Sequence, residues 1–177
     1  ILNIKKTNNK MANFLDKSEE KISKEFLQNG FVIKKIDDLK SLHWIKKTFS
    51  TILSSKNKFK NISFIKKFNQ THNYLKKKEL NNFRLDIINK LNLKKELRKK
   101  YFNCAKKYLD LIVGNELVMQ KRINLSIQFP KDNSSLLDVH ADVWSGDSPY
   151  EAVVWIPMVD CYKTKSMYIL PFSKYKK

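Results

Sequence analysis

The hydrophobic pattern of the chain changes its period near Gly114, and this change constrains the fold more than any other feature. Before Gly114, apolar residues recur every three or four positions, as on one face of an α-helix. After it, from Leu117 to Ile127, apolar and polar residues alternate, as in a β-strand with one buried face. Since helices come first and strands follow without βαβ alternation, the sequence predicts an α+β fold with an antiparallel sheet, barrel or jelly roll.

The helical half has recognisable start and stop signals. Asp16 with Glu19 three residues later resembles a capping box, and Gly30 is a suitable C-terminal stop. Asp37 is expected to cap a second helix, whose apolar stripe reaches Leu53. Further helices are expected over 80–91 and 97–112, and the lysine- and asparagine-rich residues 55–74 are expected to form a loop.

The second half predicts strands that are short and bounded by turn residues. Pro130, Pro157 and Pro171 each follow an apolar stretch, and residues 145–149 (Ser-Gly-Asp-Ser-Pro) predict a turn. A short strand is also expected before the second helix. The predicted strands are 31–33, 117–128, 136–142, 152–156 and 167–170.

The net charge of +19 comes from 36 basic and 17 acidic residues. Such an excess can indicate a nucleic-acid-binding module, but only three of the basic residues are arginines, the side chain preferred for bidentate contacts with bases. Lysine, asparagine and isoleucine are enriched together, as AT-rich coding DNA produces. The composition therefore favours a solvated basic surface, including the lysine face of the helix over 97–112, and leaves the nucleic-acid-binding module as an alternative.

One segment departs from this basic background. Residues 123–160 hold six acidic residues and a single lysine, so a local requirement for carboxylates is expected. Within it, His140 and Asp142 would project from the same side of a strand. An imidazole and a carboxylate placed together supply two ligands of the 2-His-1-carboxylate triad that binds Fe(II); a structural His–Asp pair is the alternative.

The residues around this pair extend the pattern. Val139-His140-Ala141-Asp142-Val143 is followed by Trp155-x-Pro-x-x-Asp160 and preceded by Gln120-x-Arg122-x-Asn124. This region, about 117–171, resembles the Fe(II)/2-oxoglutarate-dependent oxygenases of the phytanoyl-CoA dioxygenase-like group. More narrowly, it resembles the branch found sporadically in bacterial carbohydrate-biosynthesis clusters.

The resemblance implies that the N-terminal helices pack on a partial double-stranded β-helix of the jelly-roll or cupin-like type. It implies His140 and Asp142 as ligands of Fe(II), with 2-oxoglutarate and O2 as co-substrates. It also implies that Gln120, Asn124 and Trp155 line the 2-oxoglutarate site and that Arg122 faces the substrate. The substrate would be a small molecule such as a sugar derivative.

Two family features are absent from the sequence: the second iron-binding histidine and the arginine that follows it. His43 and His72 precede the motif and are poor substitutes. We therefore expect residues 11–177 to form a single oxygenase domain without its C-terminal strands, inactive as it stands, after a disordered or non-native leader over residues 1–10. A catalytically incomplete remnant of the same fold is the alternative.

The remaining expectations concern the cellular compartment of the protein. The sequence has no apolar stretch long enough to cross a membrane and no leader pattern typical of secretion. Cys104 and Cys161 cannot form a disulfide framework. These features predict a reduced, cytoplasmic protein without a membrane partner, and they predict no particular oligomeric state.

Overall fold

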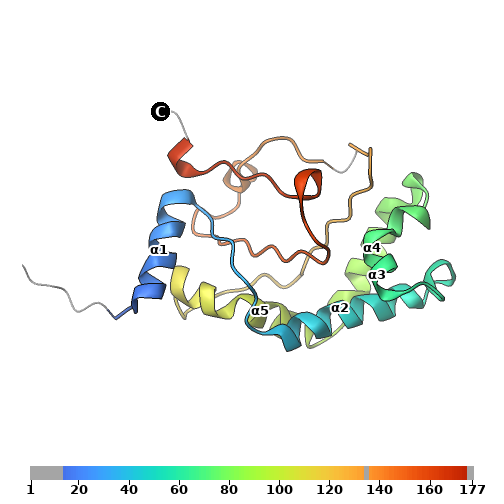
Figure 1. Ribbon diagram of the computed structural model, residues 1–177, viewed down its shortest axis with the longest axis horizontal. Helices are drawn as coiled ribbons and strands as arrows, with labels where there is room; N and C mark the ends of the chain where they lie inside the picture. Colours follow the sequence, from blue (N-terminus) through green and yellow to red (C-terminus); the bar gives the residue numbers. More distant parts are fainter. Residues whose placement is uncertain (1–13, 134–135, 175–177) are drawn as a thin grey trace, which may run out of the picture. The chain divides into compact units, whose positions relative to one another are not determined.

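The computed structural model describes residues 14–133 and 136–174, which divide into two compact units (Figure 1). Among these residues, the terminal unit comprises 14–34 and 168–174, and the middle unit comprises 35–133 and 136–167. The α-helices are α1 (Lys17–Asn29), α2 (Leu39–Ser54), α3 (Phe64–Asn69), α4 (Leu80–Asn92) and α5 (Leu97–Ile112). The short 3-10 helices are η1 (Asn57–Phe59), η2 (Thr71–Asn73), η3 (Lys77–Glu79), η4 (Asp142–Ser145), η5 (Lys163–Lys165) and η6 (Phe172–Lys174).

The terminal unit is organised by the two ends of α1. The predicted capping box is confirmed, because the Asp16 side chain accepts from the Glu19 backbone N–H at 2.9 Å and the Glu19 side chain accepts from the Asp16 backbone N–H. The predicted stop at Gly30 is also confirmed, with φ at 79°. A Cβ atom on this residue would come within 2.8 Å of the Phe172 ring in η6, so both the backbone and the packing require glycine there.

The middle unit has a core built from α2, α4 and α5. The predicted apolar stripes face one another, and the buried cluster includes Phe49 and Leu53 of α2, Ile87 of α4 and Leu97 of α5. Phe59 of η1 is fully buried in the same cluster. Two boundary predictions need correction: the N-cap of α2 is Asp38, and residues 55–74 form short helices in place of a loop.

After α5 the chain is extended, and its side chains alternate as the period of two predicts. From Met119 to Phe129, the apolar residues are half-buried and the intervening polar ones are exposed. Half-buried and exposed residues alternate in the same way from Ala152 to Met158. The half-buried sides of both segments pack against the helical core. The packed residues are Ile123, Leu125, Ile127, Ile156 and Met158.

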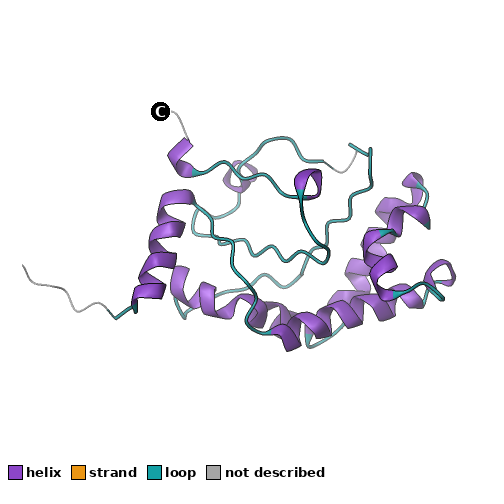
Figure 2. Cartoon of the chain, in the orientation of Figure 1, coloured by secondary structure: helices purple, strands orange, loops and turns teal. Residues whose placement is uncertain are grey.

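The predicted α+β fold and its partial jelly roll are nevertheless wrong. Residues 14–133 and 136–174 contain no β-strand, and the predicted strands appear as loop in Figure 2. The physical reason is that alternation specifies an extended backbone with one buried face, but not the hydrogen-bond partners of that backbone.

In this chain, helix side chains take part of the role of neighbouring strands. Asn92 of α4 donates to the Ile123 carbonyl and accepts from the Ile123 N–H, both at 2.9 Å. Arg98 and Tyr101 of α5 donate to the carbonyls of Met119 and Val154 at 2.8 and 2.5 Å. These contacts satisfy backbone groups of the extended chain without a sheet.

Candidate functional site

The His140–Asp142 pair is the predicted site that the structure brings together. His140 lies in the extended segment and Asp142 begins η4. Ala141 between them has extended backbone angles (φ −116°, ψ 137°), so its two neighbours project to the same side. His140 Nε2 lies 3.3 Å from Asp142 Oδ1, and the side chains are 41% and 52% exposed.

A backbone carbonyl fixes the orientation of the imidazole. His140 Nδ1 lies 2.6 Å from the Asp138 carbonyl oxygen. Because a carbonyl can only accept, Nδ1 is the donor in this contact, and Nε2 is the nitrogen that faces Asp142. Histidines that bind metals commonly show this arrangement, in which the non-ligating nitrogen donates to a carbonyl.

The pair fits two adjacent positions of a metal ion. Metal–ligand bonds of about 2.1 Å at a right angle separate the two ligand atoms by about 3 Å, close to the observed distance. A third protein ligand is not in place, since the described residues contain no group of three or more histidine, cysteine, aspartate or glutamate side chains that could hold a metal. The pair therefore fits two of the three protein ligands of a 2-His-1-carboxylate site.

The other predicted site residues make different contacts from this pair. Gln120, Arg122 and Asn124 share the exposed side of their extended segment, as the period of two requires. Arg122 donates to the side-chain oxygen of Asn89 in α4. Trp155 is 46% exposed, on the side of its segment that faces away from the helical core. In the described ranges, no hydrogen bond or ion pair joins any of these four residues to His140 or Asp142.

Besides the His140–Asp142 pair, the acidic segment 123–160 makes an ion pair with the helical region. Asp132 is buried, with a side chain 3% exposed, and its Oδ1 lies 2.7 Å from Lys77 Nζ of η3. This ion pair fastens the segment after Pro130 to the helical region. Asp132 pairs with Lys77, and Asp142 lies beside His140. Both contacts fit the expectation that this segment requires carboxylates locally.

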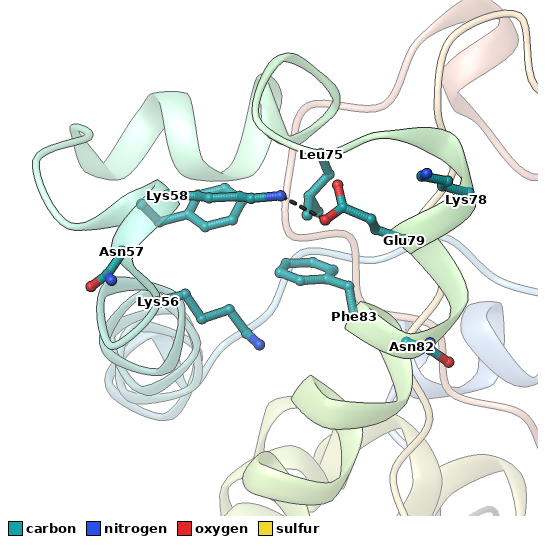
Figure 3. Close-up of a pocket in the computed structure, with 9 residues that line it drawn as sticks. Lys56, Asn57, Lys58, Leu75, Lys78, Glu79, Asn82 and Phe83 are labelled. Carbon is teal, nitrogen blue, oxygen red and sulfur yellow. Dashed lines mark hydrogen bonds and ion pairs between the residues drawn. The ribbon is translucent and has the colours of Figure 1, made fainter.

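Two cavities of the middle unit lie elsewhere. One, of about 550 Å³, opens between η1 and the start of α4 (Figure 3), and the other, of about 600 Å³, is lined by residues of α2 and α4, such as Trp44 and Lys90. None of the six predicted site residues lines either cavity. Sequence reasoning missed both cavities, because their lysines lie in the segment predicted as loop or are spread over helices.

Comparison of the chain with models of protein families, with curated proteins and with solved structures gives no match. The resemblance to the phytanoyl-CoA dioxygenase-like oxygenases therefore stays a prediction that rests on the quoted motifs. Among the described residues, no helix combines the length and the apolar character needed to span a membrane.

Proposed function

We propose that this chain carries the His-x-Asp part of the centre of a non-haem Fe(II)/2-oxoglutarate-dependent hydroxylase, whose substrate is a small molecule such as a sugar derivative. The observation that carries the proposal is the convergence of His140 Nε2 and Asp142 Oδ1 at 3.3 Å on partly exposed side chains. This geometry supports the metal-binding part of the proposal, and the assignment of 2-oxoglutarate and of a sugar-like substrate rests on the resemblance of the motif alone.

Each residue of the pair has a defined task. His140 would supply a neutral nitrogen ligand and Asp142 a carboxylate ligand. The Asp138 carbonyl would hold the imidazole ring in its orientation through Nδ1. When bound, iron with 2-oxoglutarate and O2 supplies the oxidation of a C–H bond. The protein contributes binding, orientation and the exclusion of water around these groups.

The incomplete ligand set leads to a specific expectation about this chain. Two protein ligands fill two of six iron positions, so binding of Fe(II) should be weak. Steady conversion of 2-oxoglutarate to succinate is not expected from these 177 residues, because all three arginines of the sequence precede His140 and none follows the motif to hold the distal carboxylate of 2-oxoglutarate.

The test is calorimetric titration with Fe(II) under anaerobic conditions, repeated with Co(II) and its visible absorption. His140→Ala and Asp142→Ala should each weaken binding by more than about tenfold. Asp138→Ala is the matched control, because this residue contributes its backbone carbonyl and not its side chain. His72→Ala controls for binding at another exposed imidazole.

Two outcomes would contradict the proposal. Metal binding that is unchanged in both His140→Ala and Asp142→Ala would assign the ion to another place. No binding at millimolar metal by the folded chain would leave His140 and Asp142 as a structural pair.

A further inference from the structure

The extended segment Ala152–Met158 is apolar on both of its sides. Its inner side packs on the helical core through Ile156 and Met158, whereas Val153 and Trp155 on its outer side are 65% and 46% exposed. The extended segment 119–129 differs, because the residues on its outer side are all polar. A run that is apolar on both sides is typical of extended chain covered on both faces. The outer side of Ala152–Met158 therefore has the composition of a covered surface.

The backbone of this segment has one edge with a partner and one edge without. The Val154 carbonyl accepts from the Tyr101 hydroxyl at 2.5 Å. In extended chain, the N–H and C=O groups of neighbouring residues point to opposite edges, so those of Val153 and Trp155 lie at the edge away from this contact. Within residues 14–133 and 136–174, the backbone groups of Val153 and Trp155 have no hydrogen-bond partner. They form an open edge that a further extended chain can pair with.

The two ends of this open edge lack free donors. On the N-terminal side, the Glu151 N–H already donates to the Ser148 carbonyl at 3.0 Å. On the C-terminal side, Pro157 has no N–H group. Positions 153 and 155 thus offer donors and acceptors, and positions 151 and 157 offer acceptors alone. This pattern is symmetric about Val154.

We infer that the open edge pairs with the same segment of a second copy of this chain, antiparallel and centred on Val154. In this register, Val153 lies opposite Trp155 of the second copy, and each such pair exchanges two N–H···O bonds. Glu151 lies opposite Pro157 of the second copy, so neither position leaves a free donor without an acceptor. The edge is therefore complementary to itself, which favours a second copy over an unrelated extended peptide.

The side chains suit the same register. Val153 and Trp155 of the second copy lie side by side on the outer side, and a pair of a β-branched and an aromatic residue stabilises neighbouring strands. The segment Ala152–Met158 carries no charge, so no like charges meet within it. A contact confined to so short a segment is smaller than a standard interface, and we expect a Kd on the order of 100 μM.

The test is sedimentation velocity of the full chain from about 5 to about 500 μM protein, in roughly 0.3 M salt to screen the repulsion between two chains of net charge +19. A dimer should appear as the concentration rises. Hydrogen exchange gives a residue-specific signal: the amides of Val153 and Trp155 should become protected only at the high concentration. The Val154 amide, at the opposite edge, should change least.

Three variants test the register. Val153→Lys should weaken association by at least about tenfold, because a charge at an open edge opposes pairing. Val153→Thr keeps the β-branched shape and the N–H, so its association should stay within about threefold of that of the native chain. Ser126→Lys is the matched control, because it adds the same charge to the exposed side of the other extended segment. Circular dichroism checks that each variant is folded.

The inference is overturned if the native chain stays monomeric up to about 500 μM, or if Val153→Lys and Ser126→Lys associate alike. Protection of the Val153 and Trp155 amides at every concentration would assign their partners to the same chain. Growth past the dimer into larger species would show open edge-to-edge assembly in place of a two-fold pair. Asp142→Ala should leave dimerisation unchanged, so failure here and failure of the iron site can be told apart.

Discussion

In the middle unit, the helical region Leu39–Ile112 and the extended region, residues 115–133 and 136–167, bury apolar side chains in different ways. In the helices, backbone groups bond within each element, so whole faces can be committed to the core, and residues such as Leu53 and Ile87 are fully buried. In the extended region each backbone group needs an outside partner, and apolar residues such as Ile127 are only half-buried.

The difference teaches that a hydrophobic period carries more information for helices than for extended chain. A helix is completed by its own residues, whereas an extended segment is completed by whichever groups lie beside it. Here those groups include the side chains of Asn92, Arg98 and Tyr101. The two regions should accordingly differ in their contribution to the free energy of unfolding.

The largest effect should come from truncation in the helical core. Leu53→Ala should lower the free energy of unfolding by about 3 kcal/mol, since it removes a fully buried side chain and leaves a cavity. Ile127→Ala in the extended region should cost about 1 kcal/mol, because part of that side chain already faces water. Urea titration followed by circular dichroism measures both, and equal losses would remove the distinction between the regions.

The second-largest loss of stability should come from Asn92, whose side-chain amide bonds to the backbone of Ile123 as a neighbouring strand would. Asn92→Ala removes both contacts with the Ile123 backbone and should cost about 2 kcal/mol. Asn92→Asp keeps the acceptor but loses the donor, so its cost should lie between those of alanine and the native residue. Asn82→Ala, at an exposed position of the same helix, is the control and should change stability little. A negligible cost for Asn92→Ala would show that water satisfies Ile123 equally well.

The contact between Tyr101 and Val154 should give stability a dependence on alkaline pH. Burial raises the pKa of Tyr101 to about 12, with a smaller contribution from Cys104. In the unfolded chain the hydroxyl ionises near pH 10, so the folded state binds the proton more tightly, and stability should fall between about pH 10 and 12.

Tyr101→Phe should remove this component of the pH dependence. It should also cost about 1 kcal/mol at neutral pH, through loss of the hydrogen bond to the Val154 carbonyl. Urea titrations at about pH 8, 10 and 11 span the range in which the unfolded hydroxyl ionises and compare the two proteins. If the native protein and the variant lost stability in parallel across that range, the Tyr101 hydroxyl would not be buried against the extended region.

The smallest effect should come from the basic face at and before α5. Replacing Lys94, Lys95, Lys99 and Lys106 together with glutamine should change the free energy of unfolding by less than about 1 kcal/mol, because all four side chains are exposed. Thermal unfolding at low and moderate salt measures this change. Loss of folding in the variant would show that this surface is packed against another part of the molecule.

The sequence allowed α1, α2, α4 and α5 to be predicted, but neither the short helix α3 nor the context of the extended chain. Asp16, Glu19 and Gly30 set the bounds of α1 through local contacts, which need no knowledge of the rest of the fold. The alternation before Pro130 correctly predicts extended chain with one buried face, yet its pairing depends on residues far away, such as Asn92. For the same reason, the likeness of the motif to a jelly-roll family predicted a sheet that the described residues do not form.

The candidate site likewise has one part that could be predicted from the local sequence and another that could not. His140 and Asp142 are separated by one extended residue, so their convergence follows from local geometry and could be predicted. The ring orientation set by the Asp138 carbonyl, and the cavity between η1 and α4, depend on turns whose angles the sequence does not specify.

The contact between Gly30 and Phe172 has a consequence for the order of events during synthesis on the ribosome. The two residues belong to the same unit, yet the whole middle unit is translated between them. At about 5–20 residues per second, the partner of Gly30 emerges roughly 7–30 s after α1 itself. Helix α1 is therefore synthesised well before it can pack against Phe172, and the helices of the middle unit can assemble in the interval.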